Sequence, residues 1–106
     1  MSAIFELAGL EKQWSAANPY REFLRVPAMS AGIYVLPRHG ADRLSPHQQD
    51  EIYYVVRGKA KVRMGSEESS IGPGTVLFVE AREEHRFVAI EEELVLLVVF
   101  APAETS

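Results

Sequence analysis

Two histidines and a glutamate are the side chains of this sequence best suited to hold a metal ion. His47 precedes Glu51 by four residues, and positions an even number apart in a strand lie on one face. Tyr53 and Val55 continue that face. His85 begins another apolar run, and inward residues of distant strands meet inside a small barrel. His47, Glu51 and His85 therefore predict a two-histidine, one-carboxylate site for Fe, Mn, Zn, Ni or Cu, with positions left open for water or substrate.

Each of these three residues also has a purely structural interpretation. His47 follows Pro46 in a polar loop, where an exposed histidine is common. Glu51 follows Asp50 and could belong to a solvated face. His85 follows two glutamates and could cap a turn. Short spacing patterns also arise by chance, so the spacing alone leaves both interpretations open.

Two further polar side chains belong to the same analysis. Tyr53 shares the face of Glu51, so we expect its hydroxyl to point into the barrel, where it needs a hydrogen-bond partner. The simpler interpretation of Tyr53 is that its ring packs in the wall of the barrel. The alternative is that Glu51 and Tyr53 are catalytic residues. His39 lies in a polar loop before Gly40, which predicts a position on the surface or rim.

The composition excludes several other kinds of site. The 106 residues contain no cysteine, which removes disulfides, thiolate nucleophiles and cysteine-type zinc sites. The net charge is −4 and the basic residues are scattered, so no nucleic-acid surface is indicated. The longest apolar run, residues 94–101, is far shorter than the ~20 residues of a membrane helix, and the first residues lack a signal-peptide pattern. We expect one domain over residues 1–106, in a cytoplasmic protein without a membrane partner.

The elements that must position these residues are almost all strands. Residues 3–17 could form a short helix or an N-terminal arm. The strands predicted from apolar and alternating runs are 23–26, 32–36, 50–56, 60–64, 69–71, 75–79, 85–90 and 94–100. Turns are expected at Gly58 and at residues 72–74 and 91–93. This spacing predicts an all-β barrel or sandwich. The last strand is apolar on both faces, so we expect a second subunit to cover its outer face in a homodimer.

Two stretches of the sequence resemble the two motifs of the cupin superfamily. Residues 40–58 (GADRLSPHQQDEIYYVVRG) resemble the first motif, G-x5-H-x-H-x3,4-E-x6-G. Residues 74–89, beginning GTVLFVEAREEH, resemble the second motif, G-x5-P-x-G-x2-H-x3-N. The positions in register are His47, Glu51 and Gly58 in the first motif and Gly74 and His85 in the second. The resemblance implies a single all-β cupin barrel, a double-stranded β-helix or jelly roll, with a short N-terminal arm or helix.

The same resemblance implies a ligand set, from which the sequence departs at one position. In cupins a divalent metal ion is held by the histidines and the glutamate of these motifs, which implicates His47, Glu51 and His85. Ser45 stands where the first of the metal-binding histidines would be. Ser45 through a water molecule, or Gln49 directly, could supply a weak oxygen donor. Three protein ligands with open positions remain a usual catalytic arrangement. The second motif also departs from its pattern, with Glu80, Arg82 and Ala89 in place of Pro, Gly and Asn.

The resemblance leaves the reaction open, because one fold supports many chemistries. Our first expectation is a metal-dependent enzyme that acts on a small organic molecule in the barrel. Among the possible reactions we favour a dioxygenase-like oxidation over an isomerisation or a hydrolysis. One alternative is a non-catalytic cupin that binds a small ligand. Another is a metal-free cupin isomerase or epimerase, which needs a histidine–carboxylate base and a tyrosine acid.

Overall fold

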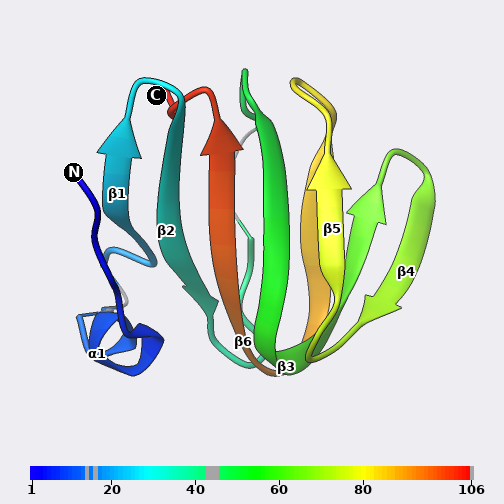
Figure 1. Cartoon of the computed structure of the whole chain (residues 1–106). Coiled ribbons are helices and arrows are strands. Elements are labelled where there is room, and N and C mark those ends of the chain that lie inside the picture. Colours follow the sequence, from blue (N-terminus) through cyan, green and yellow to red (C-terminus); the bar gives the residue numbers. More distant parts are fainter. Residues whose placement is uncertain (14, 16, 43–45, 106) are drawn as a thin grey trace.

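The chain forms an antiparallel β-barrel with a short helix near its N-terminus (Figure 1). The computed structural model describes residues 1–13, 15, 17–42 and 46–105. The elements are α1 (Leu7–Glu11), β1 (Tyr20–Val26), β2 (Met29–Leu36), β3 (Asp50–Met64), β4 (Glu67–Ile71), β5 (Val76–Val79) and β6 (His85–Ala101). The strand order is β1-β2-β6-β3-β4, and β5 also pairs with β3. None of the described helices is long enough to cross a bilayer. The all-β prediction is confirmed.

Strands β3 and β6 are long because each joins two of the predicted strands. The first half of β3 pairs with the second half of β6 and with β5. The second half of β3 pairs with the first half of β6 and with β4. If the two halves of β3 and of β6 are counted separately, the six strands correspond to the eight that the sequence predicts. The turns predicted at Gly58 and at residues 91–93 are wrong, because both strands bend there and continue.

Gly58 provides the backbone freedom for the bend in β3. Its φ is +104°, a conformation that favours glycine, and a Cβ at this position would collide with the carbonyl oxygen of Glu93 on β6. Ala89 on β6 also has a positive φ, +48°. The register between the two strands shifts repeatedly around this point. Because of the bend, the β3–β6 pair lies beside β5 with one half and beside β4 with the other.

The inner face of the barrel follows from the alternation of buried and exposed residues. In β3, Glu51, Tyr53 and Val55 are buried, whereas Ile52 and Tyr54 between them are exposed. The interior is filled by a large apolar cluster that includes Tyr34, Leu36, Tyr53, Val55, Val62, Leu77, Val79, Phe87, Ile90, Leu94, Leu96, Val98 and Phe100. Glu51 and Tyr53 therefore share the inward face that the spacing predicts.

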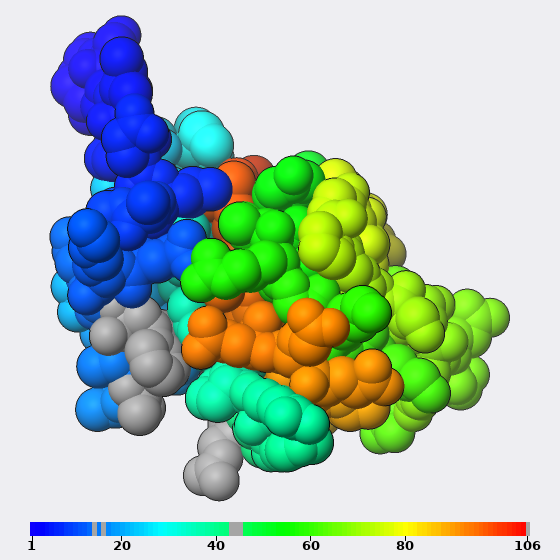
Figure 2. All heavy atoms as spheres, turned by 90° about the horizontal axis from the view of Figure 1, so that it is seen from below, coloured from blue at the N-terminus to red at the C-terminus, as the bar shows by residue number. Residues whose placement is uncertain are grey.

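The N-terminal segment covers part of the barrel's outer face. Leu7 and Leu10 of α1 and Phe23 of β1 pack on a second apolar cluster that contains Val95 of β6. The outer face of the last strand is thus covered in part by the chain itself, which the sequence did not predict. Before α1 the chain projects from the body of the molecule, as Figure 2 shows in dark blue, and Met1 is almost fully exposed.

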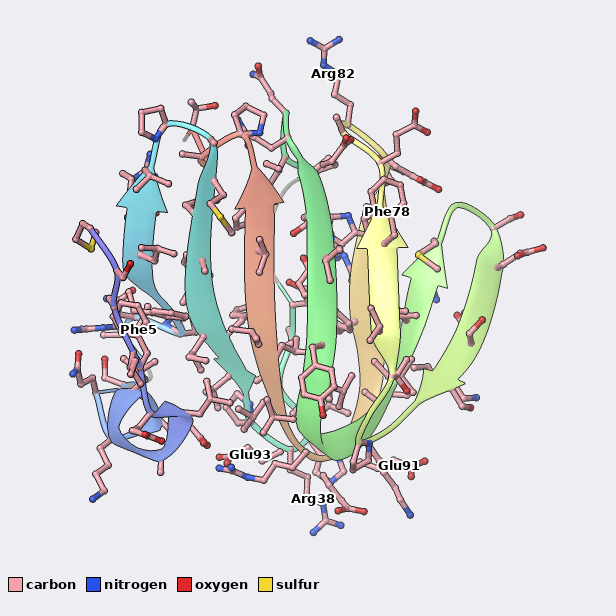
Figure 3. All side chains as sticks on the ribbon, viewed as in Figure 1. Phe5, Arg38, Phe78, Arg82, Glu91 and Glu93 are labelled. Atoms are coloured by element: carbon pink, nitrogen blue, oxygen red, sulfur yellow. The ribbon has the colours of Figure 1, made fainter. Side chains whose placement is uncertain are left out.

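The two ends of the barrel differ in the elements that they present. Strands β3 and β6 bend at the lower end, where Figure 3 places Arg38, Glu91 and Glu93. At the upper end lie the start of β3, the turn between β5 and β6, and the C-terminus (Figure 1). Arg82, in that turn, is at the upper end in Figure 3. The predicted metal ligands belong to segments of this upper end.

Candidate functional site

Two backbone segments carry the predicted ligands to the upper end of the barrel. Glu51 is the second residue of β3, and His85 is the first residue of β6. The loop before β3 is joined to the turn before β6, because the N–H of Arg82 donates to the carbonyl oxygen of His47 at 2.7 Å. This hydrogen bond brings His47 to the end of the barrel at which Glu51 and His85 lie.

Glu51, Tyr53 and His85 form a buried, hydrogen-bonded group. His85 Nε2 lies 3.0 Å from Glu51 Oε1 and 2.9 Å from the hydroxyl of Tyr53. His85 Nδ1 lies 3.0 Å from the carbonyl oxygen of Glu83, which can only accept, so Nδ1 carries a proton. The side chains of His85 and Glu51 are 2% and 1% exposed. These contacts are therefore made away from water.

The electrostatics of this group favour a cation beside Glu51. Burial lowers the pKa of His85, but its hydrogen bonds to Glu51 and to the Glu83 carbonyl outweigh that effect and raise the pKa above its ordinary value of 6.5. The protonated ring can then donate from Nε2 to the carboxylate. Burial and the charge of Glu51 raise the pKa of Tyr53 far above its ordinary value, so Tyr53 stays a neutral hydroxyl.

His47 lies at the same end of the barrel but contacts a different carboxylate. Its Nδ1 is 3.0 Å from Glu104 Oε2, and its ring packs edge-on against Phe100 with the centroids 4.7 Å apart. Its Nε2 is buried and has no hydrogen-bond partner among the described residues. Within those residues, no three His, Cys, Asp or Glu side chains are grouped closely enough to hold a metal ion. The predicted ligand set thus lies in two parts, the Glu51–His85 pair and His47 beside Glu104.

The other sequence candidates have different surroundings. Gln49 is buried, and its Nε2 donates to Thr105 Oγ1 at 2.7 Å, while its Oε1 has no partner in the described part of the chain. His39 is exposed in the loop after β2, in the surface position that the sequence predicts. Ser45 lies outside the described residues.

Asp42 is a buried polar residue that the sequence analysis missed. Its Oδ1 accepts a hydrogen bond from the Tyr34 hydroxyl at 2.8 Å, and its Oδ2 accepts one from the N–H of Phe87 at 3.0 Å. It therefore fixes the start of the loop that leads to His47 against β2 and β6. Its place inside the first motif was the available signal, but Phe87 lies 45 residues further along the chain.

Tyr20 and Glu104 were also missed, and both lie near Phe100. The Tyr20 ring is 6.1 Å from Phe100, centroid to centroid, and its buried hydroxyl has no hydrogen-bond partner among the described residues. Burial and the charges of Glu104, Glu22 and Glu51 raise the pKa of Tyr20. No sequence signal marks Glu104, because it stands in a short tail of small residues after β6.

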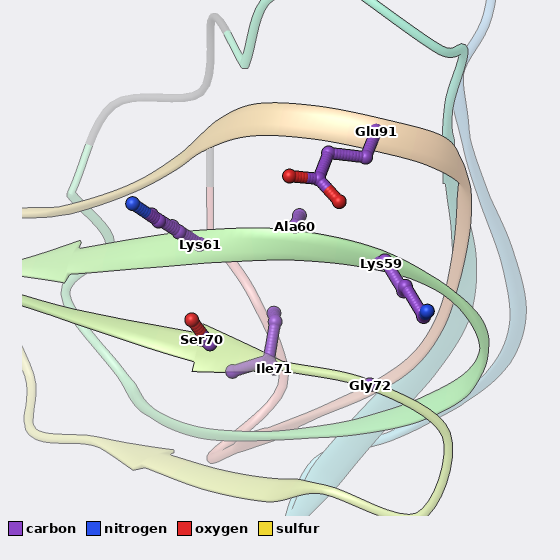
Figure 4. Close-up of a pocket in the computed structure, with 7 residues that line it drawn as sticks. All are labelled: Lys59, Ala60, Lys61, Ser70, Ile71, Gly72 and Glu91. Carbon is purple, nitrogen blue, oxygen red and sulfur yellow. The ribbon is translucent and has the colours of Figure 1, made fainter.

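A surface pocket on another part of the barrel lacks this concentration of buried polar groups. It is lined by Lys59, Ala60, Lys61, Ser70, Ile71, Gly72 and Glu91 (Figure 4). Lys59 is mostly exposed and lies 3.7 Å from Glu92, so its charge is already partnered by a surface carboxylate. The pocket mixes both charge signs on exposed side chains, and we assign it no function.

The donor atoms at the upper end fit a divalent metal ion in kind. His47 and His85 each have Nδ1 held by an oxygen acceptor, so Nε2 is the ring nitrogen left to face the site; it is unpaired among the described residues in His47, whereas in His85 it contacts Glu51 and Tyr53. His47 Nε2 and Glu51 Oε2 are buried without hydrogen-bond partners in the described residues. Unpaired buried polar atoms are costly, so their presence at one end of the barrel is consistent with a ligand there. Imidazole and carboxylate donors suit Fe, Mn, Zn, Ni and Cu.

Comparison with known proteins identifies the family. The family described as Cupin domain (Cupin_2) matches residues 32–100. The chain is 41% identical over 102 residues, 95% of its length, to an uncharacterized protein of Streptomyces coelicolor, of which the match covers 97%. The structure of KdgF from Halomonas sp. is similar with a TM-score of 0.80 at 23% identity, over 96% of this chain and 94% of that one. A Klebsiella pneumoniae protein with a double-stranded β-helix domain has a TM-score of 0.79 at 12% identity, over 96% and 91% of the two chains. The chain belongs to the cupin domain family.

Proposed function

We propose that this cupin binds a divalent metal ion through His47, Glu51 and His85, and binds a small organic molecule beside it at the upper end of the barrel. The observation that carries the proposal is the pair of histidines whose Nδ1 atoms are already held by acceptors. Nε2 is then the ring nitrogen that each imidazole can offer to a metal, in His85 once Nε2 gives up its proton and its contact with Glu51, and this is the arrangement that metal-binding histidines use. Glu51 lies against one of them and has an unpaired oxygen.

The reaction we propose first is an oxidation of the dioxygenase type. When bound, the ion supplies Lewis acidity and, if it is redox-active, the electron transfer that such an oxidation requires. Tyr53, held neutral by its raised pKa, can donate a hydrogen bond to an oxygen of the bound molecule. Phe100 and the surrounding apolar residues exclude water from the same region. Glu51 can accept a proton once its contact with His85 is given up.

A second candidate function, a metal-free isomerase, is favoured by one specific observation. His85 Nε2 already contacts both Glu51 and Tyr53, at 3.0 and 2.9 Å. A histidine–carboxylate pair beside a neutral tyrosine hydroxyl is the set that acid–base isomerisation requires. In this alternative His85 and Glu51 remove a proton beside a carbonyl group, and Tyr53 donates a proton to the product.

The metal content of the purified protein separates the two functions. The chain is purified without a metal-affinity tag, and bound metals are measured per chain in the wild type and in His47→Ala, His85→Ala and His39→Ala. We expect near-stoichiometric metal in the wild type and in His39→Ala, whose histidine is exposed, and loss of metal in the other two variants. Added ions should raise the melting temperature, since a ligand at about 100 times its Kd stabilises the native state by about 2.7 kcal/mol.

The absence of metal, with no thermal stabilisation by divalent ions, would contradict the metal site. Isotope exchange into carbonyl substrates by the metal-free protein, lost in Glu51→Gln, would then favour the isomerase. If metal is bound, oxygen uptake with catechols, flavonols and thiols tests the oxidation. A metal-loaded protein inert to all of these classes would indicate a binding protein without turnover.

We also propose that the chain forms a homodimer through the outer face of β3 and β5. Four large apolar side chains on this face are exposed, in the cross-strand pairs Ile52–Phe78 and Tyr54–Val76. Val76 and Phe78 are 62% and 60% exposed. Figure 3 places Phe78 on the outer side of β5. A contiguous apolar patch of this kind is typical of a protein interface, and a second copy of the chain offers the same face.

A further inference from the structure

The C-terminal tail is fixed at the upper end of the barrel by its backbone. Figure 1 places the C-terminus beside the turn between β1 and β2. The N–H of Glu104 donates to Ser30 Oγ at 2.9 Å, and Arg25 Nη2 donates to the carbonyl oxygen of Glu104 at 2.8 Å. Ser30 is fully buried. Both backbone groups of Glu104 are therefore held by strands β1 and β2, although the residue follows the last strand.

This anchoring directs the Glu104 side chain to His47. Glu104 Oε2 lies 3.0 Å from His47 Nδ1, and the two side chains are only 21% and 12% exposed. A carboxylate can only accept, so Nδ1 donates the proton. With Nδ1 engaged and the ring packed on Phe100, the buried Nε2 is left without a partner among the described residues.

We propose that Glu104 is a positioning residue that orients His47 as a metal ligand, an inference that rests on the proposed metal site. Its carboxylate holds the imidazole as the tautomer with a proton on Nδ1 and a lone pair on Nε2, and it makes Nε2 a stronger donor. The carbonyl oxygen of Glu83 does the same for His85. Because Ser45 stands where another histidine ligand was expected, the orientation of His47 carries more of the affinity.

Titration with Co²⁺ tests this role through metal affinity. Loss of a carboxylate behind a histidine ligand typically weakens binding by about 10–100-fold, and we expect that loss in Glu104→Ala. Glu104→Gln should lose less, because an amide oxygen can still accept from Nδ1. Glu92→Ala makes the same change of charge at an exposed glutamate paired with Lys59, and it should keep the wild-type affinity. Circular dichroism and melting curves establish that each variant is folded.

A second measurement does not depend on metal. Two-bond ¹⁵N–¹H NMR of the metal-free protein, at mildly alkaline pH, reports which nitrogen of His47 carries the proton. We expect Nδ1 in the wild type and a shift toward Nε2 in Glu104→Ala. The same tautomer in both proteins would overturn the role of Glu104, as would unchanged Co²⁺ affinity in Glu104→Ala when His47→Ala has lost binding. Absence of Co²⁺ binding in the wild type would instead overturn the metal site.

Discussion

Tyr53 contacts His85 through its hydroxyl, so removal of that oxygen isolates one contact of the buried group. Tyr53→Phe leaves His85 Nε2 with Glu51 alone, and we expect a loss of about 1–2 kcal/mol in the free energy of unfolding. Urea denaturation measures it. Tyr54→Phe is the matched control, because Tyr54 is the next residue of the same strand and is 40% exposed. Its change should stay within about 0.5 kcal/mol. Equal changes in both variants would contradict a specific contact at Tyr53.

The raised pKa of His85 predicts a pH dependence for the stability of the metal-free protein. The folded-state pKa lies above the ordinary value of 6.5, so the folded state binds this proton more tightly than the unfolded chain. The stabilisation is therefore complete below about pH 6.5 and is lost as the pH rises through the folded-state pKa. Urea midpoints of the wild type and His85→Gln, measured in a chelator, should converge toward alkaline pH. His39→Gln should follow the wild type throughout, whereas a difference that grows with pH would exclude the expected sign.

The polar residues of the site were predictable from the sequence where strand alternation or the two motifs link them, and the motifs did so for Glu51 and His85, which lie 3.0 Å apart. Glu51 and Tyr53 are two positions apart in one strand, so their common inward face follows from the period of a strand. His47 and Asp42 instead have partners that lie far away in the sequence. Glu104 contacts His47 across about half of the chain's length, and Asp42 in the first motif contacts Phe87 in the second. Such contacts depend on how loops and the tail fold over the barrel, which local sequence does not encode.

At the scale of elements, the apolar runs predicted where strands form but not where they end. Glycine at position 58 and three consecutive acidic residues, 91–93, are ordinary turn signals. In the structure the two segments lie side by side, and the acidic side chains face outward, where Glu92 and Glu93 lie 3.7 Å from Lys59 and Arg57. Pairing between β3 and β6 resumes on both sides of the register shifts at this point, so it overrides both turn signals and the strands bend instead of ending.

The bend makes Gly58 the position in β3 least able to accept a side chain. In Gly58→Ala the new Cβ meets the Glu93 carbonyl at a φ of +104°, so we expect a loss of about 2–4 kcal/mol from strain and overpacking together. Gly74→Ala is the control, because its φ is +91° and no described atom outside its own chain neighbours lies within 4 Å of the added carbon. It should lose only the backbone strain, roughly 1–2 kcal/mol. Thermal melting compares the two, and similar losses would show that close approach to Glu93 is unimportant.

At the scale of the whole molecule, the outer surface divides into a covered and an uncovered apolar part. The N-terminal segment packs on Val95 and its neighbours in β2, while Ile52, Tyr54, Val76 and Phe78 remain exposed on β3 and β5. The sequence predicted that the last strand's outer face needed a cover, since the strand is apolar on both sides. It could not predict that the first residues of the same chain would supply part of that cover.

The exposed apolar face on β3 and β5 predicts that the protein is a dimer in solution. Light scattering of the wild type should give about twice the mass of the 11.8 kDa chain. Phe78→Glu places a charge within the apolar face, opposite Ile52, and should shift the protein to the mass of one chain without loss of folding. Ile4→Glu is the control, because Ile4 is 91% exposed in the N-terminal segment, away from β3 and β5. A wild type that stays at the mass of one chain at high concentration would refute the dimer. A dimer that persists in Phe78→Glu would move the interface to another face of the barrel.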